Sequence, residues 1–200
     1  MSAKLSLTDK QAVVQALAIR ASEKLIDYCC FVFPGYATPP HLVHIAEKLT
    51  AVEQGKIRKL MIFAPPRHGK SEMVSRTFPA WYLGRNPDKR VILSSYAANL
   101  SHSFSRHVRN LIEEKKTRAI FGISTPKDSR AIDAWDIEDH RGGLLSAGVG
   151  GAITGYGANL FIIDDPVKNR EEAESEVYRE KTWEWYRNVA RTRLEPNASI

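Results

Sequence analysis

Hydrophobic residues follow two patterns along the chain. Short, nearly continuous apolar runs predict buried strands at 59–64, 90–95 and 159–164. Apolar residues that recur at helical spacing predict helices at 8–33, 41–54, 71–83, 97–116 and 169–193. Because strands and helices alternate from residue 59 onward, the pattern indicates an α/β fold with a mainly parallel sheet flanked by helices.

The stretch 121–157 is less regular. The segments 134–139 and 143–147 are expected to pair as a hairpin across a short turn. Glycines then follow at positions 148, 150, 151, 155 and 157. Such a stretch forms either a mobile loop or a loop whose backbone approaches a substrate closely, and the sequence leaves both interpretations open.

The last predicted helix has a defined start. Asn169 and Glu172 have the spacing of a capping box. After the helix, Pro196 and Asn197 are expected to form a turn, and Ser199 is expected to begin a further strand.

Composition adds little to this picture. The chain has 200 residues, 43% hydrophobic and 26% charged, as in an ordinary globular domain. No apolar run approaches the ~20 residues of a membrane helix, and residues 1–4 do not begin a signal-peptide core, so we expect a cytoplasmic protein. The net charge of +6 is compatible with a polyanionic partner and equally with a solvated basic surface.

Cysteine and histidine do not predict a metal centre. Cys29 and Cys30 are neighbours in the sequence, which disfavours a disulfide and predicts two small buried side chains. The six histidines do not combine into a set of three ligands.

The segment 64–71, with the sequence APPRHGKS, carries the clearest chemistry. It lies between a predicted strand and a predicted helix, which is the context of a phosphate-binding loop. Lys70 would reach the β- and γ-phosphates of a nucleotide, and the Ser71 hydroxyl would bind Mg²⁺. The standard pattern has glycine where this chain has Ala64. The expected nucleotide contacts in the loop are Arg67, His68, Gly69, Lys70 and Ser71.

A second motif supports the first. The strand 159–164 ends in Asp164 and is followed by Asp165 and Pro166, as in a Walker B motif. Asp164 would hold Mg²⁺ opposite the loop, and Asp165 would orient the attacking water. Neighbouring residues on a strand point to opposite faces, but a turn at Pro166 can bring both carboxylates toward the nucleotide. The alternative is a pair of exposed aspartates in a turn.

Two features point to a mechanical P-loop ATPase of the RecA or helicase type rather than a small-molecule kinase. An acid directly follows the Walker B aspartate, and the strand 90–95 lies between the two motif strands in sequence. Arg67 would stabilise the γ-phosphate in cis, as an arginine finger does, or serve a structural purpose only.

Longer segments resemble a known family. The sequences PPRHGKSE (65–72), FPAWYLGRNP (78–87), GVGGAITG (148–155) and FIIDDP (161–166) are similar to those of large terminase subunits of tailed bacteriophages. The similarity extends over nearly the whole chain from about residue 34.

This resemblance implies an ATP- and Mg²⁺-dependent motor that drives double-stranded DNA into a procapsid in the bacterial host cell. It implies a small terminase subunit and a portal protein as partners, and a homo-oligomeric ring for the full-length protein. Candidate cations for DNA contacts are Arg106, Arg109, Lys115 and Lys116. Many relatives have a glutamine that binds adenine upstream of the loop, and His44 occupies the comparable region here. Many also have glutamate in place of Asp165.

The resemblance also predicts the organisation of the chain. We expect an N-terminal helical segment at 1–40 and an ATPase core at 41–200, without the nuclease domain that follows the motor in the family. In this class the next strand inserts between the two motif strands, so we expect a core that stops at the start of that strand and hydrolyses ATP weakly. The alternatives are a translocase of helicase superfamily 2 and a non-catalytic prophage remnant.

Overall fold

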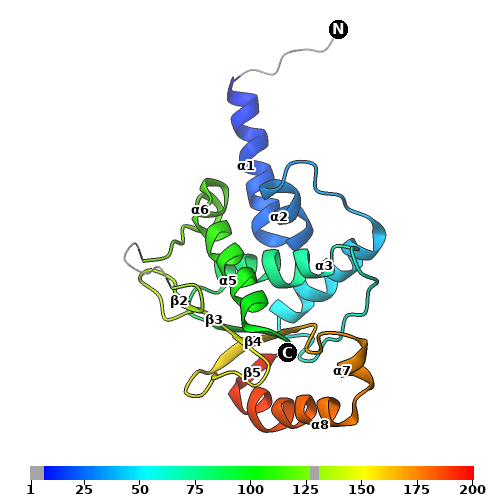
Figure 1. Ribbon diagram of the computed structural model, residues 1–200. Helices are drawn as coiled ribbons and strands as arrows, with labels where there is room; N and C mark the ends of the chain where they lie inside the picture. Colours follow the sequence, from blue (N-terminus) through cyan, green and yellow to red (C-terminus); the bar gives the residue numbers. More distant parts are fainter. Residues whose placement is uncertain (1–6, 127–130) are drawn as a thin grey trace.

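The computed structural model describes residues 7–126 and 131–200 and consists of one sheet with helices on both of its faces (Figure 1). The expectation of no signal peptide rests on residues 1–4, which lie outside the described residues. The helical elements are α1 (Leu7–Glu23), α2 (Leu25–Val32), α3 (Pro40–Glu53), the π-helix η1 (Glu72–Thr77), α4 (Phe78–Arg85), α5 (Ala98–Glu113), α6 (Lys115–Phe121), α7 (Arg170–Glu174), α8 (Glu176–Trp185), the π-helix η2 (Tyr186–Ala190) and the 3₁₀-helix η3 (Arg191–Arg193).

The sheet has five strands in the order β2-β3-β1-β4-β5. The strands are β1 (Arg90–Ser95), β2 (Ala134–Asp136), β3 (Gly143–Gly148), β4 (Ala158–Asp164) and β5 (Leu194–Ser199). All neighbours are parallel except β2, which forms the predicted antiparallel hairpin with β3. The predicted mixed α/β fold with a mostly parallel, helix-flanked sheet is therefore confirmed.

Side chains that alternate along the central strands fill two separate cores. Val91 and Leu93 of β1 lie in the core beneath α2–α5, whereas Ile92 lies in a smaller core with Phe161 and Trp185. Figure 1 shows α1 to α6 on one side of the sheet and α7 and α8 on the other. Because both faces are covered, the central strands are buried along nearly their whole length and mostly apolar, as is usual for parallel sheets.

Three of the predicted helices are broken. The stretch 8–33 divides at Lys24 and the stretch 97–116 at Glu114, each with an extended backbone at the break. The last helix divides at Ser175. The first break lets α2 turn Tyr28 into the core, where its hydroxyl lies 2.9 Å from the Thr117 hydroxyl. Tertiary packing thus overrides local helix propensity at these positions.

The prediction of a buried strand at 59–64 is wrong. The segment belongs to no strand, and Met61 and Phe63 are 79% and 85% exposed. Only its start is paired, because the Leu60 N–H donates to the Ile200 carbonyl at 2.9 Å and the Ile200 N–H to the Arg58 carbonyl at 2.8 Å. Beyond Leu60 the segment forms no backbone hydrogen bond to a strand within the described residues.

Two smaller predictions are also corrected. The expected turn at Pro196 and Asn197 is part of β5, and the irregular backbone there is accommodated by a register shift against β4 and a positive φ of 66° at Asn197. Cys29 is buried as predicted, but Cys30 is exposed on the outer side of α2. None of the helices in the described residues combines the length and hydropathy that crossing a bilayer requires.

Candidate functional site

The predicted phosphate loop curls between the extended segment 59–64 and the helix that begins at η1. Arg67 and Gly69 have positive φ angles of 63° and 82°. A Cβ atom at Gly69 would lie 3.1 Å from a methyl carbon of Leu42, so α3 closely supports the loop. Left-handed residues alternating with ordinary ones aim successive backbone N–H groups into a concavity, which is a common way to bind an anion.

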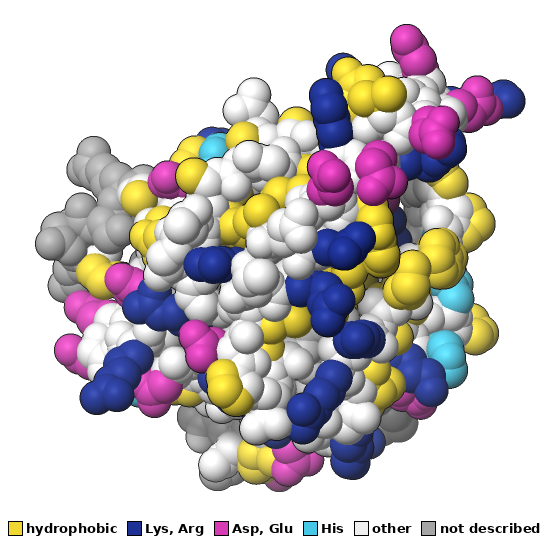
Figure 2. Space-filling view, turned by 90° about the horizontal axis from the view of Figure 1, so that it is seen from below, with side chains coloured by type: hydrophobic (Ala, Val, Ile, Leu, Met, Phe, Trp, Pro, Cys, Tyr) yellow, Lys and Arg dark blue, Asp and Glu magenta, His cyan; other side chains and the backbone are white. Residues whose placement is uncertain are grey.

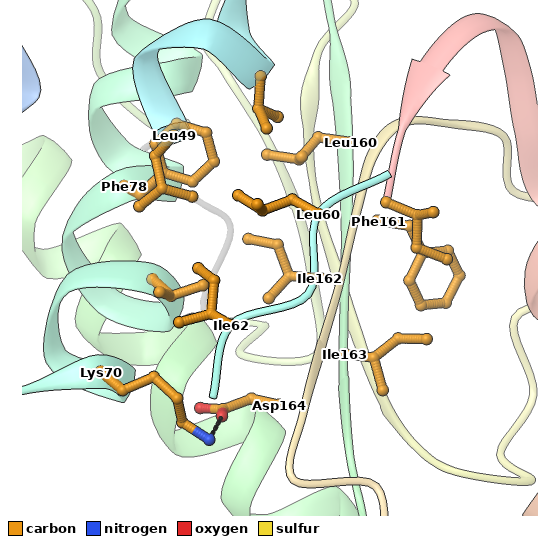
Figure 3. A pocket seen from close by; sticks show the side chains of 13 residues that line it. Leu49, Leu60, Ile62, Lys70, Phe78, Leu160, Phe161, Ile162, Ile163 and Asp164 are labelled. Atoms are coloured by element: carbon orange, nitrogen blue, oxygen red, sulfur yellow. Dashed lines mark ion pairs between the residues drawn. The ribbon is translucent and has the colours of Figure 1, made fainter. Parts of the chain in front are cut away.

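Lys70 joins this loop to the end of β4. Its ammonium lies 2.6 Å from Asp165 Oδ1 and 3.4 Å from Asp164 Oδ1. Figure 3 shows Lys70 and Asp164 facing each other from the loop and the strand. Partial burial acts to lower the pKa of Lys70, but the hydrogen bond to Asp165 and the charges of both carboxylates outweigh it, so this pKa is raised.

The two aspartates face the loop together because the chain turns sharply after β4. Asp165 has a positive φ of 47°, and its carbonyl accepts the Tyr96 N–H at 3.1 Å. Asp164 is 5% exposed, whereas the side chain of Asp165 is 59% exposed. The turn at the strand end thus gives one buried and one accessible carboxylate on the same side of the sheet.

A serine that the sequence did not single out completes the surroundings of Asp164. Ser75 is fully buried in η1, and its hydroxyl donates to Asp164 Oδ2 at 2.7 Å. The signal in the sequence is weak, because a serine four residues after Ser71 is ordinary within a helix.

Histidine contact with the loop comes from His41 rather than from His44. His41 Nε2 lies 3.0 Å from the His68 carbonyl oxygen, and the two rings are 5.8 Å apart. His44 lies on the same helix, 66% exposed and 3.8 Å from Glu47. The family resemblance pointed to His44, and nothing in the sequence indicated that His41 contacts the loop.

Arg67 is exposed at the tip of the loop. Within the described residues its guanidinium has no hydrogen bond and no ion pair. An arginine that is not tied down is available to a bound anion.

A cavity of about 100 Å³ extends from Lys70 and Asp164 between the segment 59–64 and β4. Leu60 and Ile62 line one side and Leu160 and Ile162 the other (Figure 3). Its walls are apolar except at the end where Lys70 and Asp164 meet.

The donor set suits Mg²⁺. The hydroxyl of Ser71 and the carboxylate of Asp164 are hard oxygen donors, which Mg²⁺ prefers. No group of three or more His, Cys, Asp or Glu side chains in residues 7–126 and 131–200 is arranged to hold a metal ion. In nucleotide sites Mg²⁺ usually has one or two protein ligands, and phosphates and water complete its shell.

The glycine-rich stretch begins at the same edge of the sheet. It follows the carboxyl end of β3, and the Val149 N–H donates to the Ser95 carbonyl at 2.8 Å. A Cβ atom at Gly148 would come within 2.9 Å of the Ala98 N atom, so this position requires glycine. Ligands of open parallel sheets bind beyond the carboxyl ends of the strands.

Comparison with known proteins identifies a family. The model of the terminase large subunit, T4-like virus type, N-terminal part, matches residues 61–197, which is more than half of the chain. No curated protein matches the sequence. The matched range includes Lys70, Ser75, Asp164 and Asp165.

Proposed function

Since this chain belongs to the terminase large subunit family, we propose that residues 41–200 form a P-loop ATPase core that drives the packaging of double-stranded DNA. The observation that carries the proposal is the contact of Lys70 with both Asp164 and Asp165, which joins the loop motif to the strand motif.

In this proposal the loop binds the phosphates of ATP. Backbone N–H groups of residues 67–71 and the N-terminal end of the helix face the phosphates, and the Lys70 ammonium exchanges Asp165 for phosphate oxygens. Ser71 and Asp164 would hold Mg²⁺, which neutralises charge on the phosphates. The Asp165 carboxylate, released from Lys70, is then free to accept a hydrogen bond from the attacking water.

Two further residues complete the proposed site. The free guanidinium of Arg67 stabilises charge that develops on the γ-phosphate. The adenine lies against the N-terminal half of α3, where His41 supports the loop through the His68 carbonyl. His44, predicted from the family resemblance, is the next histidine along this helix and stays a prediction.

Double-stranded DNA is the proposed polymer substrate, and a basic surface supports it. Figure 2 shows Lys and Arg side chains gathered in a band across the face that carries α7 and α8. Arg58 lies beside the end of β5 through a 2.7 Å hydrogen bond to Asn197, and Arg191 precedes its start. We define the β5 basic surface as the exposed Lys56, Arg58, Lys59, Arg187 and Arg191, none of which forms an ion pair within the described residues.

Two of the four cations that the sequence suggested for DNA contacts, on α5 and α6, form hydrogen bonds within the protein. Arg109 donates to the Ala131 carbonyl at 2.6 Å, and Lys116 to the Phe31 carbonyl at 2.5 Å. Arg106 and Lys115 are exposed. Contacts with a small terminase subunit, a portal and further copies of the chain in a ring, in the host cytoplasm, belong to the same proposal and follow from the family.

The proposal is tested by calorimetric titration of the chain with Mg²⁺ and ATP. We expect binding that is lost in Lys70→Ala and kept in Lys59→Ala, a matched exposed lysine in the preceding segment. Undiminished binding in Lys70→Ala would show that the loop does not hold the phosphates.

A further inference from the structure

The helix after the phosphate loop leaves α-helical geometry directly after its first turn, in which the Met73 N–H donates to the Gly69 carbonyl at 3.0 Å. Residues Glu72–Thr77 form a π-turn, in which the Phe78 N–H donates to the Met73 carbonyl. The Thr77 hydroxyl also donates to the Glu72 carbonyl at 2.9 Å. Single π-turns inside helices are rare and concentrate at functional sites.

Pro79 gives a physical reason for this turn. It has no N–H to donate to the carbonyl of Ser75, four residues earlier, and its ring would clash with that carbonyl in a regular α-helix. A wider turn directly before Pro79 relieves both problems. The sequence therefore fixes an irregular turn at the position of Ser75.

The turn sets Ser75 against the end of β4. The Ser75 hydroxyl donates to Asp164 Oδ2 at 2.7 Å, while Asp164 Oδ1 faces the Lys70 ammonium at 3.4 Å. Ser75 is 0% and Asp164 5% exposed, so little water is available to replace either contact. The two oxygens of one carboxylate thus have different and fixed partners.

We propose that Ser75 is a positioning residue for the nucleotide site, which holds the Asp164 carboxylate in one rotation so that Oδ1 stays directed at the loop. The inference rests on the proposed function, because Asp164 is there the residue that faces Mg²⁺. The last torsion angle of a carboxylate has only broad energy minima. A fixed orientation of the two oxygens therefore requires a hydrogen bond of this kind. Ser71, not Ser75, remains the hydroxyl that faces the nucleotide.

The test compares ATP binding with and without Mg²⁺ in Ser75→Ala. Removal of the hydroxyl leaves Asp164 Oδ2 without its buried donor. We expect the Mg²⁺ concentration that half-saturates ATP binding to rise by about tenfold to a hundredfold, the range typical when a partner of a metal ligand is removed. ATP binding in excess EDTA, measured by calorimetry, is expected to be unchanged.

Two controls separate positioning from simple loss of packing. Ser101→Ala removes another fully buried serine hydroxyl, on α5, which donates to the Ala98 carbonyl, and it is expected to leave the Mg²⁺ dependence unaltered. Ser75→Thr keeps the hydroxyl and is expected to restore most of the Mg²⁺ dependence. If Ser75→Ala does not fold, Ser75→Cys, which keeps the volume but donates weakly, provides the same comparison.

An unchanged Mg²⁺ requirement in Ser75→Ala or Ser75→Cys, with Lys70→Ala still abolishing binding, would overturn the role of Ser75 and leave the proposed function standing. Loss of ATP binding in EDTA to the same extent as in Mg²⁺ would also overturn it, because Ser75 would then support the fold of the loop and not the carboxylate.

Discussion

Lys70 and Asp165 form a short ion pair, which the nucleotide of the proposed function would have to break. The 2.6 Å contact occupies the ammonium with which the chain would bind phosphate, and it restrains an aspartate that is otherwise exposed. Exchange of one anionic partner for another keeps the charge on Lys70 compensated throughout. The pair therefore holds both groups in place, and in the proposed function a phosphate would replace Asp165 at the ammonium.

Asp165→Asn separates binding from chemistry at this residue. An amide cannot accept a proton from water, so we expect Mg²⁺-ATP binding to persist while turnover falls by a factor of ~10² or more. Calorimetry and phosphate release measure the two quantities, and Asp139→Asn, an exposed aspartate in the turn before β3, serves as the control. Loss of binding in step with turnover would instead make Asp165 a metal ligand.

Cys29 and Cys30 provide a residue-level check of the N-terminal helices. Burial raises the pKa of Cys29 to about 12, whereas Cys30 is exposed. Because the thiolate is the reactive species, we expect one thiol per native chain to react with a thiol reagent near pH 8 and none in Cys30→Ser. Two reactive thiols in the native chain would contradict the placement of α2 against the core.

Elements whose signal is local were predictable from the sequence. Apolar runs located β1 and β4, and Asn169 caps α7 as predicted, since its side chain accepts the Glu172 N–H at 2.9 Å. The Glu172 carboxylate accepts the N–H of Lys168 rather than that of Asn169, so the reciprocal half of the capping box is shifted by one residue. The breaks at Lys24 and Glu114 were not predictable, because both residue types favour helices and the breaks arise from packing between distant segments. The π-turn follows from Pro79, but only the fold shows that Asp164 lies opposite it.

The segment 59–64 shows the limit of pattern analysis for strands. Its side chains alternate as in a strand: Leu60 and Ile62 face the cavity, and the two residues that follow them, Met61 and Phe63, face solvent. A β-strand also requires a neighbouring strand with which its backbone forms hydrogen bonds. Ile200 directly follows β5, which pairs with β4, and its backbone is bonded to Arg58 and Leu60. The chain after β5 therefore lies beside the start of the segment, where the sequence predicted the next strand. The sequence could not show how far that pairing extends.

Hydrogen exchange tests this description of the segment. The Leu60 amide is bonded to the Ile200 carbonyl, whereas the Ile62 amide has no backbone partner within the described residues. We expect the Leu60 amide to exchange more slowly than that of Ile62, and that of Ile92 in the centre of the sheet to exchange most slowly of the three. Equal protection of Leu60 and Ile62 would indicate a paired strand through the whole segment.

At the scale of the molecule, the sequence showed an excess of Lys and Arg but did not show on which surface these side chains lie together. In the sequence, Arg187 and Arg191 lie near the end of a predicted helix, where favourable interaction with the helix dipole is a sufficient reason for their charge. The fold adds the cations of 56–59 beside β5, and this arrangement depends on contacts between segments far apart in the chain. Sequence spacing therefore could not define the β5 basic surface.

Binding to DNA distinguishes the two candidate surfaces. If the β5 basic surface contacts phosphates, Arg187→Ala with Arg191→Ala should lower the slope of log affinity against log salt by about 2, since each phosphate contact contributes about 0.9. Fluorescence anisotropy with duplexes of two unrelated sequences measures this slope. Arg106→Ala with Lys115→Ala, the matched pair on α5 and α6, should leave it unchanged, and the opposite result would move the DNA contact to those helices.

The central claim is that the loop 64–71 and the two aspartates after β4 form one nucleotide site. A crystal structure of the chain with Mg²⁺ and a non-hydrolysable ATP analogue tests it most directly. We expect phosphates against the backbone of residues 67–71, with the Lys70 ammonium moved from Asp165 to a phosphate oxygen and Ser75 still bonded to Asp164. A nucleotide bound elsewhere, or a Lys70–Asp165 pair that persists beside it, would contradict the account.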